Sequence, residues 1–119
     1  MRIAVKGRNT PVPDELREHI ERRFTKIAKQ VSDLAELEVE VFEERNPAIA
    51  DSQVAEVTLH LKGVTLRARE CSPEMSHSIC ELADDVRRQV KKHRELRRKR
   101  SRTRRLVDQM RGRPAQLHP

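Results

Sequence analysis

Hydrophobic and polar residues alternate along several short segments of the chain, which is the pattern of strands with one buried face. The alternation predicts strands over Arg2–Gly7 and Leu37–Phe42 and a hairpin over Val54–Glu70. A two-residue turn at Lys62-Gly63 pairs Leu61 with an apolar residue across the hairpin, so the predicted register keeps the apolar side chains on one face.

Two other segments repeat their apolar residues at spacings of three and four, as amphipathic helices do. The first covers Asp14–Gln30 and starts after two prolines, and its stripe consists of Leu16, Ile20, Phe24, Ile27 and Val31. The second is expected over Pro73–Leu96, with Ser72 as the N-cap and Pro73 at the first helical position. Its stripe consists of Met75, Ile79, Leu82, Ala83, Val86 and Val90.

The predicted order is β-α-β-β-β-α, and the fold class is α+β: a four-stranded sheet with two helices packed on one face. The second helix would span about 36 Å at ~1.5 Å per residue, whereas six- or seven-residue strands span about 20–24 Å. The helix should therefore overhang the sheet. Beyond Leu96 the apolar spacing fades, so we expect residues 97–119 to be frayed or mobile, with Gly112 and Pro114 ending any helix. The predicted domain is 1–98, followed by a basic tail or linker over 99–119.

Charge is distributed very unevenly along the chain, although the net charge is only +7. Residues 1–86 hold 12 Lys and Arg against 17 Asp and Glu, whereas residues 87–119 hold 14 against two. Such a dense run of like charge repels itself, and the helix dipole rewards only one or two cations near a C-terminus. The second helix is thus predicted to be long and basic and to bind a polyanion.

Nucleic acid is the favoured polyanion. A membrane is less suitable, because the chain has no transmembrane-length apolar run, no signal peptide and no Trp to bury in an interface. With no Tyr or Trp and two Phe, base stacking on aromatic side chains is not available, so recognition should rely on phosphates. Arg88, Lys91 and Lys92 lie opposite the apolar stripe. Arg22, Lys26 and Lys29 share the outer face of the first helix, where ordinary solvated surface is the simpler interpretation.

Catalytic and metal chemistry find little support in the sequence. The five His lack Glu or Cys partners at catalytic spacing, and no glycine-rich phosphate loop is present. Cys71, His77 and Cys80 match no known zinc spacing, which favours free thiols in a reducing cytoplasm. We therefore expect no enzyme activity, no cofactor, no metal and no small-molecule substrate.

Four segments occurring in order resemble the ribosome hibernation-promoting factor family, also called ribosomal subunit interface protein or sigma-factor modulation protein. They are VKGRN (5–9), PDELREHIERRFTKIAK (13–29), VAEVTLHLKG (54–63) and RRQVKKHRE (87–95), and the likeness covers roughly residues 1–98. The resemblance implies a fold similar to double-stranded RNA-binding domains. It also implies binding to the small ribosomal subunit between head and body, where messenger RNA and transfer RNA anticodons lie, in stationary phase or stress.

The same resemblance implies which basic residues contact rRNA: Arg88, Lys92 and Arg94 most directly, and Arg87, Lys91, Lys26 and Lys29 by adjacency. The charge run adds Arg97 and Arg98, and the outer face of the first helix adds Arg22. The chain departs from the family pattern at Glu74-Met75-Ser76, where relatives commonly have a tyrosine, so any contact of that tyrosine is absent. It also stops where long relatives continue into a dimerisation domain, so it is either a short form or a fragment.

The sequence thus predicts a cytoplasmic ribosome hibernation factor, monomeric when free, that binds small-subunit rRNA in the decoding channel and inhibits translation by idle ribosomes. One alternative is a general binder of structured RNA or DNA without ribosome preference. Another is an interaction module that modulates a sigma factor.

Overall fold

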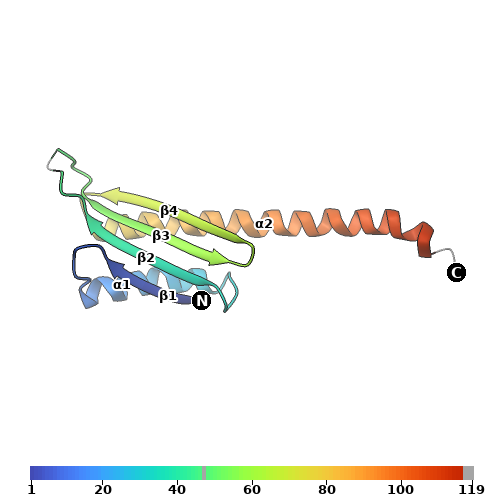
Figure 1. The fold of residues 1–119 in the computed structure, drawn as a ribbon, viewed down its shortest axis with the longest axis horizontal. Coiled ribbons are helices and arrows are strands. Elements are labelled where there is room, and N and C mark those ends of the chain that lie inside the picture. Colours follow the sequence, from blue (N-terminus) through green and yellow to red (C-terminus); the bar gives the residue numbers. More distant parts are fainter. Residues whose placement is uncertain (47, 117–119) are drawn as a thin grey trace.

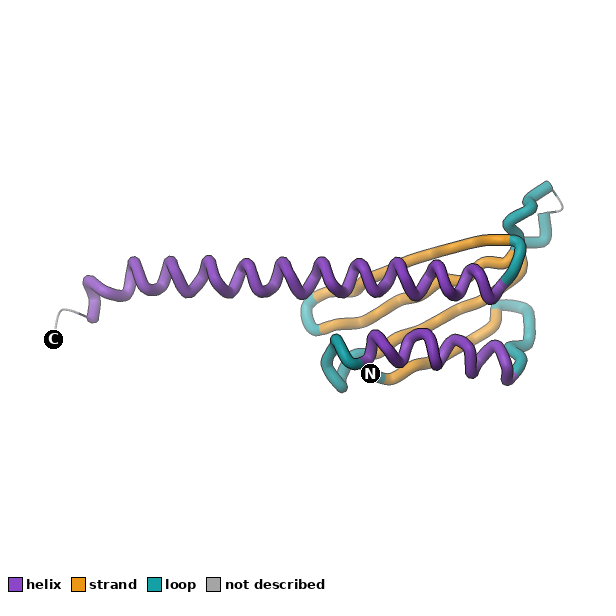
Figure 2. Tube along the Cα trace, turned by 180° about the vertical axis from the view of Figure 1, so that it is seen from behind, coloured by secondary structure: helices purple, strands orange, loops and turns teal. Residues whose placement is uncertain are grey.

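The computed structural model describes residues 1–46 and 48–116. Its elements are β1 (Arg2–Gly7), α1 (Asp14–Ala28), β2 (Glu36–Glu43), β3 (Gln53–Leu61), β4 (Val64–Ser72) and α2 (Met75–Gln116). The strands form one four-stranded sheet in the order β1-β2-β3-β4, in which β1 is parallel to β2 and the other neighbours are antiparallel. Both helices lie on the same face of this sheet (Figures 1 and 2). The predicted α+β class and element order are confirmed.

The hydrophobic core lies between this face of the sheet and the two helices, and the predicted apolar stripes build it. The core consists of Ile20, Phe24 and Ile27 from α1, Ala35 just before β2, Leu37, Val39 and Val41 from β2, Ala55, Val57 and Leu59 from β3, and Ile79, Leu82, Ala83, Val86 and Val90 from α2. α2 packs against β3 and β4, whereas α1 packs against β1 and against α2. α1 also provides the crossover that a parallel β1–β2 pair requires.

The connection after β1 depends on two residues with special backbone positions. A Cβ on Gly7 would collide with the backbone carbonyl oxygen of Thr10, so only glycine fits there. Asn9 has a φ of 56°, in the left-handed region that Asn tolerates better than most residues. These two constraints explain why the segment VKGRN (5–9) has glycine at position 7 and asparagine at position 9.

The β3–β4 hairpin has the predicted register. Leu61 pairs with Val64 across a turn formed by Lys62 and Gly63, and Gly63 has a φ of +81°. A glycine adopts this left-handed conformation without the steric cost that a side chain would add. The hairpin prediction is confirmed.

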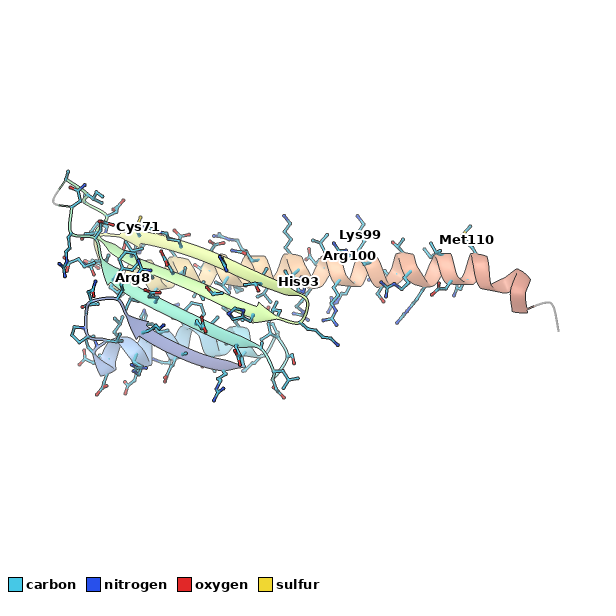
Figure 3. All side chains as sticks on the ribbon, viewed as in Figure 1. Arg8, Cys71, His93, Lys99, Arg100 and Met110 are labelled. Carbon is cyan, nitrogen blue, oxygen red and sulfur yellow. The ribbon has the colours of Figure 1, made fainter. Side chains whose placement is uncertain are left out.

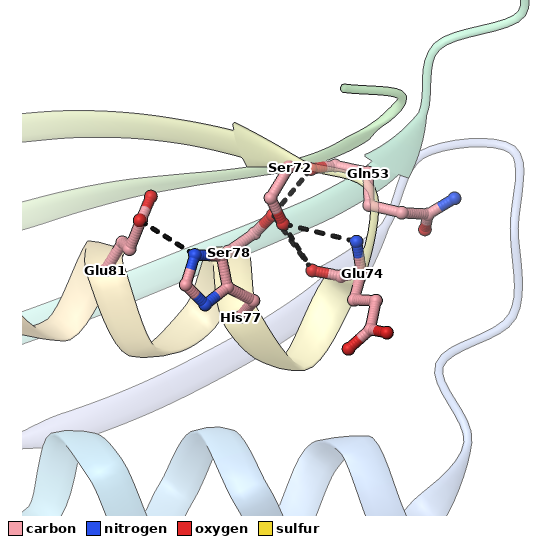
Figure 4. Close-up of polar contacts among 6 residues, drawn as sticks. All are labelled: Gln53, Ser72, Glu74, His77, Ser78 and Glu81. Atoms are coloured by element: carbon pink, nitrogen blue, oxygen red, sulfur yellow. Dashed lines mark hydrogen bonds and ion pairs between the residues drawn. The ribbon is translucent and has the colours of Figure 1, made fainter. Parts of the chain in front are cut away.

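The start of α2 differs from the prediction, because Ser72 is the last residue of β4 and the helix begins at Met75 rather than Pro73. The Glu74 N–H donates to Ser72 Oγ at 3.3 Å, and Ser72 Oγ lies 2.7 Å from Ser78 Oγ. Ser78 in turn donates to the Gln53 carbonyl oxygen at 2.7 Å (Figure 4). Both serines are buried, so this hydroxyl pair joins the first turn of α2 to the start of β3.

The end of α2 lies much further along the chain than Leu96, at Gln116. The predicted overhang is confirmed, and its 42 residues correspond to about 63 Å of helix at ~1.5 Å per residue, in a molecule of 73 × 28 × 19 Å. The prediction that Gly112 and Pro114 end the helix is wrong, since α2 includes both. Arg, Lys, Leu and Gln favour helix by intrinsic propensity, so the helix persists where no core remains to cover. Mobility of residues 97–119 stays a prediction, and 117–119 lie outside the described residues.

Candidate nucleic-acid interface

The ten basic residues proposed from the sequence all have exposed side chains. Seven lie on α2 and three on α1: Arg87, Arg88, Lys91, Lys92, Arg94, Arg97 and Arg98, and Arg22, Lys26 and Lys29. On α2 the buried residues Val86 and Val90 hold the sheet-facing side of the helix. The basic residues between them, and most of those after them, project to other sides of the helix. Arg97 lies two turns after Val90 on the same side, but it is exposed and lines the surface beside the β3–β4 hairpin. A partner can therefore reach these residues without disturbing the core.

The two helices run in the same direction, and α1 ends at the end of the sheet where α2 passes the β3–β4 hairpin and continues outward (Figures 1 and 2). Lys26 lies in the last turn of α1, and Lys29 is its C-cap residue. The fold thus brings the basic end of α1 to the same end of the domain as the basic part of α2, although about 60 residues separate them in the chain.

The surface of α1 is electrically mixed. Glu18 and Glu21 share one shallow surface with Arg22, Lys26 and Lys29. On α2, by contrast, Glu95 is the only acid between Arg87 and Arg105 in the sequence. The stronger positive surface is therefore that of α2, and the three bases of α1 are secondary to it.

Few of these cations are neutralised within the protein. Arg87 Nη2 lies 3.5 Å from Asp84 Oδ1, and this is the only ion pair that involves the ten residues in the part of the chain the structure describes. Both partners are well exposed, so the pair is worth little. The other nine charges are available to an external anion.

The opposite face of the sheet contrasts with this surface, because several of its charges pair with one another. Arg8 Nε lies 2.5 Å from Glu40 Oε1 and Arg8 Nη2 lies 3.5 Å from Glu56 Oε2, while Arg69 Nη1 lies 3.4 Å from Glu56 Oε1. The hydrogen bond to Glu40 raises the pKa of Arg8 above its ordinary value. Both arginines also lie over the ring of Phe42, at 4.3 and 5.7 Å from its centroid. Arg8 and Arg69 are therefore already paired within the protein.

The N-terminal half of α2 carries a small acidic group beside β4. Burial and then the nearby carboxylates of Asp85 and Glu81 raise the pKa of Glu70, and Arg88 partly opposes this effect. Charge thus changes sign along one helix: the first turns carry Glu81, Asp84 and Asp85, and the helix is basic from Arg87 onward. A polyanion is repelled by the first part and attracted by the second.

The residues considered for metal or catalytic chemistry point to different partners. His77 Nε2 lies 2.9 Å from Glu81 Oε1 on the surface of α2, whereas Cys80 Sγ lies 3.9 Å from His19 Nε2 at the α1–α2 contact. Cys71 is exposed on β4, and both cysteines are free thiols. Among the described residues no group of three His, Cys, Asp or Glu is placed to hold a metal ion.

No helix in the described part of the chain has the length and apolar character needed to cross a lipid bilayer. α2 is long enough, but its outer half is dominated by Arg and Lys.

The sequence analysis did not predict that Arg8 and Arg69 pair with Glu40 and Glu56, because nothing in the sequence distinguishes these two arginines from the other basic residues. The alternation of β2 placed Glu40 and Phe42 on one face, but which distant arginines cover them depends on strand pairing. It also missed Lys62 as a member of the basic end of the domain, because the hairpin tip reaches α2 only in the folded chain.

Comparisons with known proteins agree with the fold. A model of the family described as Sigma 54 modulation protein / S30EA ribosomal protein matches residues 3–98. A ribosome hibernation promotion factor from Picosynechococcus sp. is 29% identical over 96 residues, which cover 80% of this chain and 50% of that protein. A ribosome hibernation promoting factor from Acinetobacter guillouiae is 26% identical over 101 residues, covering 81% of this chain and 89% of that protein. The chain thus spans about half the length of the first relative and most of the second.

Among solved structures, the crystal structure of the Thermus thermophilus protein Y N-terminal domain matches with a TM-score of 0.67 at 21% identity. The match covers 78% of this chain and 99% of that one. This likeness shows that the two chains share a fold.

Proposed function

Since the chain belongs to the Sigma 54 modulation protein / S30EA ribosomal protein family, we propose that it is a ribosome hibernation factor. In this proposal it binds rRNA of the small ribosomal subunit in the channel that messenger RNA and transfer RNA use, and so inhibits translation by idle ribosomes. Relatives named ribosome hibernation promotion or promoting factor support a role in ribosome hibernation. The activity proposed is binding rather than catalysis.

The observation that carries the proposal is the unpaired positive surface of α2. Within the described residues, Arg88, Lys91, Lys92, Arg94 and Arg97 have exposed side chains and no ion-pair partner, and they lie on a helix that leaves the body of the domain. Self-repulsion among such charges is offset when they neutralise phosphates and release counterions. rRNA supplies a dense and structured array of phosphates.

The proposed mechanism is steric. The α/β body occupies the space of messenger RNA and of transfer RNA anticodons, and α2 lies along rRNA phosphates. The contact residues we propose are Arg87, Arg88, Lys91, Lys92, Arg94, Arg97 and Arg98 on α2, with Arg22, Lys26 and Lys29 on α1. Arginine suits this role because its planar guanidinium group can bind a phosphate through two hydrogen bonds. The free protein in this proposal is a monomer.

The sheet face is a poor candidate for the RNA contact. Two of its arginines, Arg8 and Arg69, already pair with Glu40 and Glu56, and binding phosphate there would break those pairs. The proposal therefore assigns RNA binding to the helical face alone, which makes it testable by comparing the two faces.

Sedimentation of the protein with purified small subunits and whole ribosomes at rising salt tests the proposal. We expect co-sedimentation that weakens with salt and that is blocked when transfer RNAs fill the A and P sites. Because a generic duplex RNA offers phosphates but no channel, it should bind more weakly at the same salt. Equal affinity for duplex RNA and ribosomes, or binding unaffected by transfer RNA, would support a general RNA-binding module instead. Absence of ribosome binding, together with capture of a sigma factor, would support the interaction module.

A further inference from the structure

An open groove of about 770 Å³ lies between the tip of the β3–β4 hairpin and α2, at the point where the helix leaves the sheet. Val64, Leu66 and Leu96 give it an apolar floor. Its cationic residues are Lys62 from the turn and Lys92, Arg97 and Arg100 from α2. Figure 3 shows His93, which also lines the groove, where α2 passes the hairpin, and Arg100 beyond it.

The groove exists because the hairpin ends while α2 continues. Gly63 at the tip carries no side chain, and the space beside it is open, because no heavy atom beyond its two chain neighbours lies within 4 Å of the position of a Cβ. Leu96 is the next apolar residue of α2 after the buried Val90, and its side chain is 45% exposed. Leu96 thus extends the apolar floor that Val64 and Leu66 provide, and the cationic residues form the rim of the groove.

The chemistry of this groove selects its ligand. None of the residues that line it is acidic, so its charge complements an anion. The apolar floor complements a flat apolar group, and the guanidinium planes of Arg97 and Arg100 can stack on a nucleobase. The volume lies within the ~300–1,000 Å³ range of small-ligand sites. A nucleotide combines these features, since it has an apolar-faced base and a phosphate.

We propose that the groove holds one unstacked nucleotide of the RNA that α2 binds, with the base on Leu96 and the flanking phosphates at Lys62 and Lys92. This inference rests on the proposed RNA-binding function. RNA is favoured over a free nucleotide because the groove is open and continuous with the positive surface of α2. Lys92 belongs to both, so a strand that follows the helix can insert one base without leaving the phosphate contacts.

Two RNAs that differ in one feature test the proposal: a perfect duplex, and the same duplex with one bulged adenosine. Fluorescence anisotropy of the full chain at fixed salt measures both affinities. We expect the bulged RNA to bind about fivefold or more tightly, which corresponds to about 1 kcal/mol or more, because only the bulge offers an unstacked base to the groove. Excess adenosine 5′-monophosphate should remove this preference while the perfect duplex stays bound.

Leu96→Gln provides the matching variant, and Leu106→Gln provides its control. Both leucines are exposed on α2, at 45% and 60%, and Gln has nearly the helix propensity of Leu. Only Leu96 lines the groove. We expect Leu96→Gln to lose the preference for the bulged RNA and to keep wild-type affinity for the perfect duplex, whereas Leu106→Gln keeps both.

Equal binding of the two RNAs by the wild-type protein overturns the groove proposal and leaves the phosphate-binding function standing. Equal loss of preference in both leucine variants also overturns it, because the effect would then not be specific to the groove. Binding of the mononucleotide without any preference for the bulge excludes RNA as the source of the nucleotide. Failure to bind ribosomes and both RNAs refutes the proposed function together with the groove.

Discussion

The salt dependence of RNA binding gives the sharpest test of which face carries the interface. The perturbation is Arg88→Gln combined with Lys91→Gln, which removes two exposed charges from α2 that have no ion-pair partner among the described residues. Glutamine preserves the helix because its propensity is close to those of Arg and Lys. Both positions lie away from the hairpin groove, so the groove keeps its lining.

The magnitude follows from the number of phosphate contacts removed. Each contact contributes about 0.7–0.9 to the slope of log affinity against log salt, so losing two should reduce the slope by about 1.4–1.8. Between 50 and 200 mM salt, the affinity of the variant should therefore fall about tenfold less than that of the wild-type protein. The variant should also bind more weakly throughout the lower part of this range.

The control variant is Lys6→Gln combined with Arg67→Gln, which removes two exposed cations from the opposite face of the sheet. It has the same net charge as the α2 variant. If contact with phosphate matters, its slope should equal that of the wild-type protein; if only net charge matters, both variants should change alike.

The assay is titration of labelled small-subunit rRNA, or of small subunits, with each protein at four or more salt concentrations. Thermal unfolding of each variant, followed by circular dichroism, checks that the fold is intact. An unchanged slope for the α2 variant would show that Arg88 and Lys91 do not contact phosphate, and equal changes in both variants would refute the assignment of the interface to the helical face.

Three further predictions concern stability. Gly7→Ala should lower the free energy of unfolding, measured in urea, by about 1–3 kcal/mol, because the new Cβ collides with the Thr10 carbonyl oxygen. An unchanged free energy of unfolding would contradict this steric clash. Ser78→Ala should cost ~1–3 kcal/mol, because it removes the hydroxyl that donates to the Gln53 carbonyl and pairs with the buried Ser72 hydroxyl, whereas the exposed Ser76→Ala should be nearly neutral. Glu70→Gln should raise the Tm at pH 7, because the raised pKa of Glu70 shows that its ionised form opposes folding; this gain should vanish below pH ~4, where folded and unfolded states are both protonated.

Local periodicity carried much of the fold prediction. Alternation in β2 and β3 placed Leu37, Val39 and Val57 in the core, and the pairing of Leu61 with Val64 set the hairpin register. These features depend on neighbours in the chain, and a shift of one residue would expose every apolar side chain of a strand. The exposure of most of the ten candidate basic residues was also predictable, because the apolar stripe defines the opposite side of each helix. Arg97 is the exception, since it follows Val90 by seven residues on the same side, and only the fold showed that it is exposed.

The predicted length of α2 was too short because the end of the apolar stripe, at Leu96, was taken as the end of the helix, whereas the helix continues to Gln116. The apolar stripe does end near Leu96, but intrinsic propensity and the absence of Gly or Pro between Met75 and Arg111 are enough to continue the helix. Periodicity reports which face is buried, whereas propensity reports whether the backbone stays helical. The two signals give different answers where a helix extends beyond its domain, because the apolar periodicity stops there while the helix propensity remains high.

The sequence by itself determined the order of the elements, the faces they bury and the concentration of positive charge after Val86. Only the tertiary structure decided which cations are already occupied: Arg8 and Arg69 bind Glu40, Glu56 and the ring of Phe42, whereas the bases of α2 largely remain unpaired in the described part of the chain. The structure alone also brought Lys62 beside Leu96 to form the groove. Periodicity depends on bonds between neighbours in the chain, but ion pairs and grooves depend on how distant segments cross, and many crossings are compatible with the same pattern.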